Sequence, residues 1–270
     1  MVTIVQRHSP PPPATTPVQE GHLQAVERVI STMRSDVSHP YTLDTFAEIA
    51  NYSPYHFARM FRGVVGVPPG EFLAALRFER AKHLILNSPA SITEICMEVG
   101  FASLGTFSAR FKHLVGRSPA ELRDMPDMLH SRLPLLEPCL GQRQMRIGGQ
   151  TIHGSVMSTT PRKGHLFIGL FPSAIPQSAP VAGTLISGPG PFRIANVQPG
   201  NYRILAAQFP YGDNPLIHLL PDESLLVRAD PRPLVVQAGG QPRPARVQLR
   251  PRVPTDPPIL TVLAPSLLGL

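Results

Sequence analysis

At 270 residues the chain is long enough for two modest domains, each with its own core. Its two cysteines, Cys96 and Cys139, are too few for a disulfide framework, and the first thirty residues lack the features of a signal peptide, so we expect a soluble, cytoplasmic protein. The longest apolar run, 259–270, falls short of the roughly 20 residues that span a bilayer, so no membrane partner is expected.

The formal net charge of +7 is unevenly distributed along the chain. Residues 20–125 hold eleven Lys or Arg and eleven Asp or Glu, whereas residues 126–270 hold thirteen basic and seven acidic residues. Net charge therefore does not locate a nucleic-acid site, which must be argued from the positions of individual charges.

Proline divides the chain into three parts, with five prolines in residues 1–17, six in 20–125 and twenty-two in 126–270. Because helix interiors tolerate few prolines, only the middle part is expected to be largely helical. We interpret residues 1–19 as a disordered, Pro-rich arm and residues 126–148 as a linker to a second domain at 149–270.

The middle part contains an internal repeat with an offset of 50 residues. The first copy is recognised at Ser53, Phe57, Phe61, Arg62, Gly66 and Pro69, and the second at Ser103, Phe107, Phe111, Lys112, Gly116 and Pro119. In each copy, apolar residues three and four apart indicate a helix, a short break and a second helix in a new phase. The repeat thus predicts two helix-turn-helix motifs, at about 43–65 and 92–115.

Capping residues support both motifs. In the first copy Ser53 can cap the second helix, Pro54 suits its first position, and Gly66 ends it. In the second copy Gly100 can adopt the left-handed conformation that ends the first helix, and Ser103 can cap the second.

A further helix is expected between the copies, at 70–87, about 27 Å long at 1.5 Å per residue. It could hold the two second helices about one DNA turn, roughly 34 Å, apart. Residues 53–66 and 103–119 carry basic residues and no acid, whereas the first helices carry acids. This segregation places positive charge where a helix would enter the major groove.

The helical part resembles the AraC/XylS family of transcription regulators over about 105 residues. The matching positions are Leu43, Phe46, Ala47, Ser53, Pro54, His56, Phe57, Arg59, Phe61, Arg62, Gly66, Arg77, Ala81, Ile92, Ile95, Gly100, Phe101, Ser103, Phe107, Phe111, Lys112, Gly116, Ser118, Pro119 and Arg123. The resemblance implies that residues 20–125 form a double helix-turn-helix domain, which binds two successive major grooves of double-stranded DNA.

The DNA-binding residues are expected on the second helices and at their N-caps. They are Ser53, Tyr55, Ala58, Arg59, Arg62, Ser103, Leu104, Gly105, Thr106, Ser108, Ala109, Arg110 and Lys112. The resemblance implies base contacts from Tyr55, Ala58, Arg59, Leu104, Gly105, Ser108 and Ala109. Arg62 and Lys112 are expected to meet phosphates, which position a protein without reading sequence. Within the domain, we expect Arg77 to form an ion pair and Cys96 to fill a small buried slot.

From about residue 149 the pattern changes to short runs of strand-like sequence between Gly and Pro. The expected strands are 151–158, 165–171, 181–186, 192–197, 202–208, 225–228, 234–237 and 245–250. Such runs favour an all-β sandwich, so the expected fold class is multidomain, all-α followed by all-β. Residues 190–207 resemble a strand-turn-strand of transthyretin-like and carboxypeptidase-regulatory-like domains, which implies that Phe192 and Tyr202 pack the core.

These features predict a sequence-specific DNA-binding transcription regulator whose β domain senses a small molecule or forms a dimer. Double-stranded DNA is the expected partner, and RNA polymerase, a small-molecule effector and a second copy of the chain are further candidates. We expect no catalytic residue, metal or cofactor, because His153, His165 and His218 lack metal-ligand spacing and no nucleophile motif is present. The alternative is an enzyme or small-molecule-binding module with vestigial DNA binding.

Overall fold

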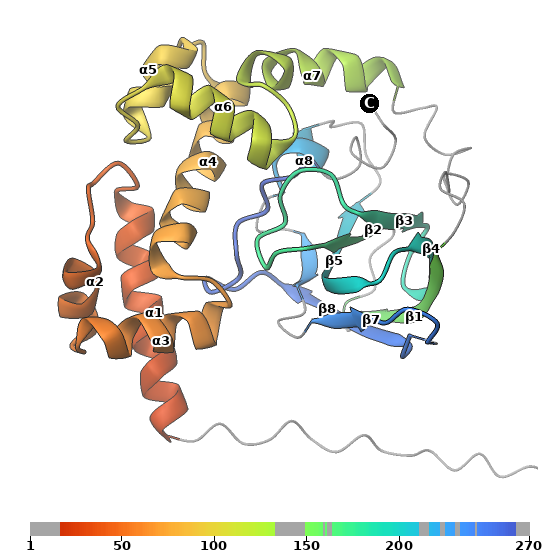
Figure 1. Cartoon of the computed structure of the whole chain (residues 1–270). Helices are drawn as coiled ribbons and strands as arrows, with labels where there is room; N and C mark the ends of the chain where they lie inside the picture. Colours follow the sequence, from red (N-terminus) through yellow and green to blue (C-terminus); the bar gives the residue numbers. More distant parts are fainter. Residues whose placement is uncertain are drawn as a thin grey trace, which may run out of the picture.

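The computed structural model describes residues 17–132, 149–158, 160, 164–210, 216–221, 225–229, 233–240 and 242–262. A helical part and a β part lie side by side (Figure 1), which confirms the predicted order of α then β. Most of the predicted arm and linker lies outside the described residues. None of the described helices is long and apolar enough to cross a membrane.

The helical part is built from seven described helices in chain order. They are α1 (Pro17–Ser35), α2 (Leu43–Ala50), α3 (Pro54–Val65), α4 (Pro69–Asn87), α5 (Ile92–Glu98), α6 (Leu104–Val115) and α7 (Pro119–Arg132). Helices α2 and α3 form the first predicted motif, and α5 and α6 form the second. Helix α4 joins them, with α3 near one of its ends and α6 near the other (Figure 1).

Caps fix the ends of the two second helices. Gly66 and Gly116 end α3 and α6 in the left-handed conformation, with φ of 91° and 88°, which costs glycine little. Ser103 caps α6 as expected, accepting a hydrogen bond from a backbone N–H at 3.4 Å. Ser53 occupies the N-cap position of α3 but makes no side-chain cap bond.

Two helix boundaries differ from the sequence prediction. Helix α1 begins at Pro17, inside the arm predicted to reach residue 19, because proline is accepted in a first turn. Helix α7 continues past Pro126, where the linker was expected to begin. Burial of Leu122, Met125 and Leu129 in the core offsets the hydrogen bond that a helical proline loses.

A phenylalanine-rich core runs through both motifs. Phe57 and Phe61 of α3 and Phe107 and Phe111 of α6 are fully buried, as their helical spacing predicted. Phe78 of α4 packs against both Phe107 and Phe111, with ring centroids 5.9 and 6.1 Å away. The second motif is thus anchored directly on the connecting helix.

The β part consists of eight strands and a short helix, α8 (Leu216–Leu219). The strands are β1 (Gln150–Ser158), β2 (Gly164–Phe171), β3 (Ala182–Ile186), β4 (Gly190–Val197), β5 (Gly200–Pro210), β6 (Leu226–Ala229), β7 (Leu234–Val236) and β8 (Ala245–Pro251). Each predicted strand corresponds to one of them.

Hydrogen bonds join the strands in the order β3-β2-β5-β6-β8-β1-β4, with β7 paired to β5. The β1–β8 ladder is parallel and the other ladders are antiparallel. The sheet curls around an apolar core that includes Phe192 and Tyr202, which are buried as the sequence implied. Its two outermost strands, β3 and β4, are consecutive in the chain and contact each other.

The helical and β parts share one core rather than meeting only at a linker. Four residues of the β part, Ile175, Leu219, Leu260 and Val262, are buried in the same apolar cluster as the helical side chains. The two parts therefore form a single packed unit, which the sequence did not predict.

Candidate DNA-binding interface

The outer face of α3 presents the expected residues of the first motif to solvent. Tyr55 is 79% exposed, and Arg59 and Arg62 are also exposed. The Arg59 guanidinium lies 5.8 Å from the centre of the Tyr55 ring, a cation–π arrangement that orients both side chains. Ala58 is half-buried beside them. This face combines hydrogen-bond donors with an aromatic surface and carries no acid.

The outer face of α6 is chemically poorer. Leu104 is 39% exposed, Gly105, Thr106 and Ala109 are exposed, and Ser108 is half-buried. These small and apolar side chains offer few donors to base edges. Contact with thymine methyl groups suits them better than hydrogen bonding does.

Arg110, the arginine nearest this face, is held by the domain itself. Its guanidinium lies 5.7 Å from the Phe78 ring centre and 5.8 Å from that of Phe101. Lys112, one turn from the end of α6, is exposed. Each helix thus carries two exposed basic residues, but Arg110 of α6 packs on core rings of the domain, whereas Arg59 of α3 packs on the exposed ring of Tyr55.

Among the described residues, Arg77 has no acidic partner for the predicted ion pair. Its guanidinium donates instead to main-chain carbonyls, including Val37 O at 2.7 Å and His39 O at 3.0 Å. Burial is the main cause that lowers the Arg77 pKa, followed by the charge of nearby Arg110. Cys96 is fully buried as expected, and burial raises the pKa of its thiol.

The loop between β2 and β3, residues 172–181, contacts both second helices at their C-terminal ends. A Cβ placed on Gly66, at the end of α3, would lie 3.5 Å from the Ala174 methyl. At the end of α6, Ser178 N donates to Leu114 O at 2.6 Å and Ser178 Oγ donates to His113 O. Ser178 takes the left-handed conformation, with φ of 55°, which is uncommon for a residue with a side chain.

A second contact joins the β part to α4. Lys82 is 1% exposed, and its Nζ donates to Leu260 O at 3.0 Å and Ile259 O at 3.3 Å. Burial lowers the Lys82 pKa to about 7, with Glu79 opposing the shift and Arg252 adding to it. Glu79, three residues earlier on the same face of α4, pairs with Arg252 at 3.3 Å.

Sequence reasoning missed this docking, although α4 carried a signal for it. Its buried residues, Pro69, Phe72, Leu73, Ala75, Leu76, Phe78, Ala81, Lys82 and Ile85, surround much of the helix. A helix with apolar residues around most of its surface packs against neighbours on more than one side. A lysine buried in such a helix needs carbonyl or carboxylate partners for its amine.

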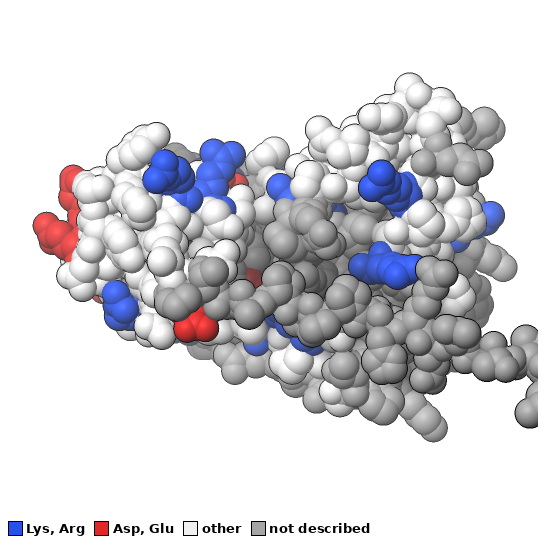
Figure 2. Space-filling view, turned by 90° about the horizontal axis from the view of Figure 1, so that it is seen from below, with Lys and Arg blue, Asp and Glu red and all other residues white. Residues whose placement is uncertain are grey.

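Charged side chains are sparse on the face seen from below the view of Figure 1. Figure 2 shows separate Lys and Arg patches over the helical part and the β part, with acids gathered at the outer edge of the helical part. No continuous basic stripe crosses the described surface in this view. In this view the basic residues of the β part and those of the helical part therefore do not form one continuous patch.

Two helix-turn-helix motifs with exposed, acid-free second helices on one buried helix define a DNA-binding domain. Comparison with known proteins agrees, because residues 46–125 match a family model described as a helix-turn-helix domain. The HTH-type transcriptional activator AarP of Providencia stuartii is 28% identical over 113 residues, which are 42% of this chain and 83% of AarP. The helical part is thus a helix-turn-helix DNA-binding domain, similar to that of known transcription regulators.

Two other known proteins are similar to part of this chain. AdaA of Bacillus subtilis, a bifunctional transcriptional activator and DNA repair enzyme, is 29% identical over 103 residues, covering 38% of this chain and 49% of AdaA. A solved transcriptional regulator of Chromobacterium violaceum, described with AraC-type DNA-binding domain-containing proteins, is 26% identical over 38% of this chain and 93% of its own, with a TM-score of 0.37. The chain thus spans about half of AdaA, and the β part lies outside the family match.

Proposed function

We propose that this protein regulates transcription by placing α3 and α6 in two successive major grooves of its operator, with the β part holding the two helices at a fixed spacing. In this arrangement α3 reads bases through Tyr55 and Arg59, while Arg62 and Lys112 meet phosphates. Helix α6 contributes shape and apolar contact through Leu104 and its small neighbours rather than donor-rich base reading.

One observation carries the proposal. The β part contacts α3 and α6 at their C-terminal ends, yet Tyr55, Arg59 and Leu104 stay exposed with the whole chain present. The β part thus contacts the ends of α3 and α6 and leaves their outer faces open. This arrangement supports DNA binding in this conformation.

The fixed spacing is supported by three separate attachments. Helix α4, about 28 Å long at 1.5 Å per residue, joins the motifs and packs against the core of the second through Phe78. The β2–β3 loop contacts the C-terminal ends of α3 and α6. Lys82 attaches α4 to the β part through its hydrogen bonds. A rigid separation of this kind suits operators with one half-site spacing.

Selection of bound sequences from a random DNA pool, using the full chain, tests the proposal. We expect one enriched site with two blocks of preferred bases about 10 base pairs apart. Arg59→Ala should lower specific affinity by about 1–3 kcal/mol and relax the preference within one block. Arg110→Ala should change the preference within the other block much less.

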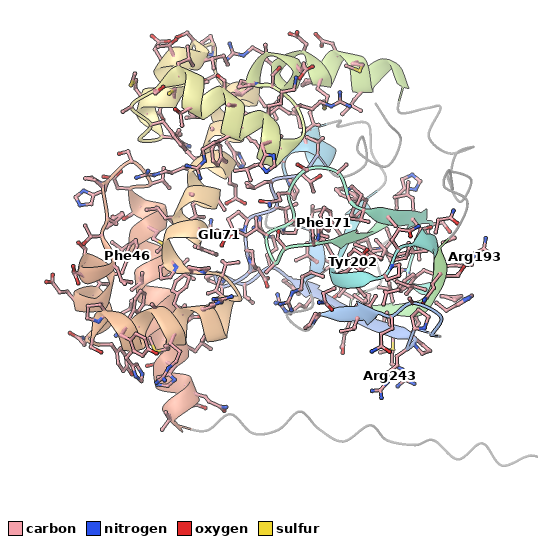
Figure 3. The ribbon with its side chains drawn as sticks, viewed as in Figure 1. Phe46, Glu71, Phe171, Arg193, Tyr202 and Arg243 are labelled. Carbon is pink, nitrogen blue, oxygen red and sulfur yellow. The ribbon has the colours of Figure 1, made fainter. Side chains whose placement is uncertain are left out.

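Arg243→Ala is the matched control, because Arg243 is an exposed arginine that points away from the helical part (Figure 3). It should leave the selected sequence and its affinity unchanged. Absence of any enriched sequence would favour the alternative of vestigial DNA binding. An Arg59→Ala variant with full affinity and preference would remove Arg59 from the interface.

RNA polymerase is a further proposed partner, supported by the printed names of AarP and AdaA, both transcriptional activators. Transcription in vitro from a template carrying the selected site separates activation from repression. A rise in transcript that depends on the site supports a contact with polymerase, and a fall supports repression by occlusion.

A further inference from the structure

The curled sheet of the β part leaves a seam between its two outermost strands. Strand β3 is paired with β2, and β4 is paired with β1, and these are the two ends of the hydrogen-bonded order. Because residues 187–189 join β3 directly to β4, the two ends are brought close together. The seam is therefore the place where the hydrogen-bonded order of strands is interrupted, although β3 and β4 contact each other.

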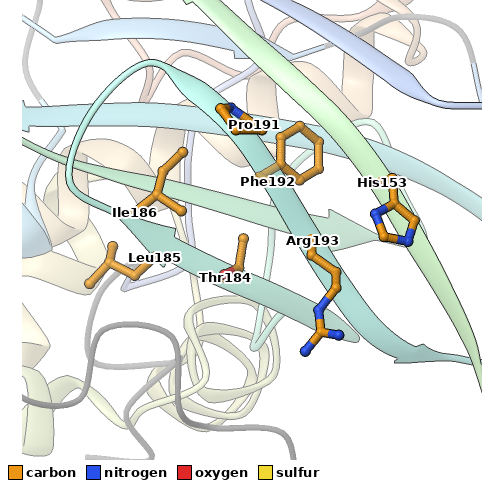
Figure 4. Close-up of a pocket in the computed structure, with 7 residues that line it drawn as sticks. All are labelled: His153, Thr184, Leu185, Ile186, Pro191, Phe192 and Arg193. Carbon is orange, nitrogen blue, oxygen red and sulfur yellow. The ribbon is translucent and has the colours of Figure 1, made fainter.

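A cavity of about 350 Å³ lies at this seam (Figure 4). It is lined by His153, Thr184, Leu185, Ile186, Pro191, Phe192 and Arg193. Its volume falls within the roughly 300–1,000 Å³ of small-molecule sites, which are typically apolar with a few converging polar groups. Of the apolar lining residues, Leu185 and Ile186 are half-buried, whereas Phe192 is buried in the core of the sheet.

The polar groups of this cavity are cationic or hydrogen-bond donating. His153 of β1 and Arg193 of β4 are directly opposite each other in the ladder, so their side chains emerge together from one face of the sheet (Figure 4). Across the described residues of the β part the one carboxylate is Asp256, which is bound by Arg250 at 2.6 Å. Arg193 is exposed and has no carboxylate partner among the described residues.

We propose that the seam cavity binds a small organic anion, a carboxylate with an apolar body. The carboxylate accepts hydrogen bonds from the Arg193 guanidinium, a fork that matches its two oxygens, with His153 and the Thr184 hydroxyl as neighbouring donors. The apolar body lies against Leu185 and Ile186, the half-buried apolar residues of the lining. None of these residues belongs to the proposed DNA-binding face.

Strand β3 connects this site to α3 and α6. This part of the proposal rests on the proposed DNA-binding function. Strand β3 begins at Ala182, directly after the loop that contacts Gly66 and Leu114. A ligand that pulls β3 toward β4 therefore acts on the segment that holds the ends of α3 and α6. The cavity would be the effector site of the regulator.

Binding is tested first without DNA. The full chain is titrated with phenylacetate and with hexanoate, and with their uncharged counterparts phenylacetamide and hexanamide, by isothermal titration calorimetry. We expect saturable binding of at least one carboxylate, with its amide weaker by roughly tenfold or more, because a charge-assisted hydrogen bond is lost. Arg193→Gln should weaken carboxylate binding by a similar factor, whereas Arg243→Gln, an exposed arginine outside the cavity, should not.

The second measurement is the affinity for the selected DNA site with and without the carboxylate. The effector role is supported if the carboxylate changes the DNA affinity of wild type but not that of Arg193→Gln. Without ligand, the DNA affinity of Arg193→Gln should equal that of wild type. If the carboxylate binds but DNA affinity does not change, the proposed anion site is supported and its regulatory role is overturned. If no carboxylate binds, or if the amides bind equally well, the anion site is overturned, whatever the DNA measurements show.

Discussion

Lys82 is an unusual choice for the centre of a protein interface, and replacing it with methionine tests how the two parts are held together. Lys82→Met keeps the length and apolar stem of the side chain but removes the amine that serves Ile259 O and Leu260 O. Two buried carbonyls then lack that donor. Each lowers the free energy of unfolding by about 1–3 kcal/mol if no other donor reaches it. The variant should still fold, because the stem continues to fill its space.

The free energy of unfolding should depend on pH through this amine. Its pKa is about 7 in the folded protein and about 10.4 in an unfolded chain, so unfolding takes up a proton between those values. Wild-type stability therefore rises with pH across this window and is flat below it. From about pH 7 to about pH 9 the gain is about 2 kcal/mol, which is roughly 4–8 °C in Tm for a chain of this size.

Thermal unfolding followed by circular dichroism measures this gain as the difference in Tm between wild type and Lys82→Met. Other titrating groups are common to both proteins and cancel in the difference. The difference should widen as the pH rises, and Lys112→Met, which removes an exposed lysine, should leave the pH dependence as in wild type. Parallel curves for wild type and Lys82→Met would refute the burial of a neutral amine at this interface.

Three further substitutions probe single features, each by the midpoint of urea unfolding. Gly100→Ala should destabilise by about 2 kcal/mol or more, since φ is 83° and the new Cβ would be 2.7 Å from a main-chain oxygen. Gly105→Ala should not, because its Cβ would meet Ser103 Oγ at 3.9 Å, an ordinary contact distance. Arg77→Met should cost roughly 1–3 kcal/mol, because carbonyls of the loop 37–39 lose their donor. Asp256→Asn should cost roughly 1–3 kcal/mol by weakening the paired bonds from Arg250, and an unchanged midpoint would show that pair to be dispensable.

The elements that could be predicted from the sequence are those set by local interactions. Apolar spacing placed α3 and α6 to within a residue, and Gly66 and Gly116 marked their ends because few other residues accept the left-handed conformation. Gly and Pro breaks likewise separated the strands. Of the interface, the sequence predicted which residues lie on the second helices, and solvent exposure of Tyr55 and Arg59 agrees with it.

What the sequence could not supply depends on distant contacts. Lys82 and Leu260 are 178 positions apart, and no local pattern links them. Arg77 was interpreted from its charge as an ion-pair residue, yet the partners it has among the described residues include main-chain carbonyls of a distant loop. The DNA contact expected of Arg110 stays a prediction; its guanidinium also lies over the Phe78 ring. The resemblance of residues 190–207 to transthyretin-like domains stays a prediction, because the family match covers only residues 46–125.

Main-chain atoms make much of the contact between the two parts. Ser178 N meets Leu114 O, and Lys82 meets the carbonyls of Ile259 and Leu260. Every residue type carries these atoms, so the side chains of the β2–β3 loop and of residues 259–260 can change over evolution while the docking persists. A change in length cannot be absorbed in this way, because inserting or deleting one residue moves every later carbonyl. Relatives with this docking should therefore be recognised by conserved loop length and by the lysine of α4, and much less by sequence identity in the β part.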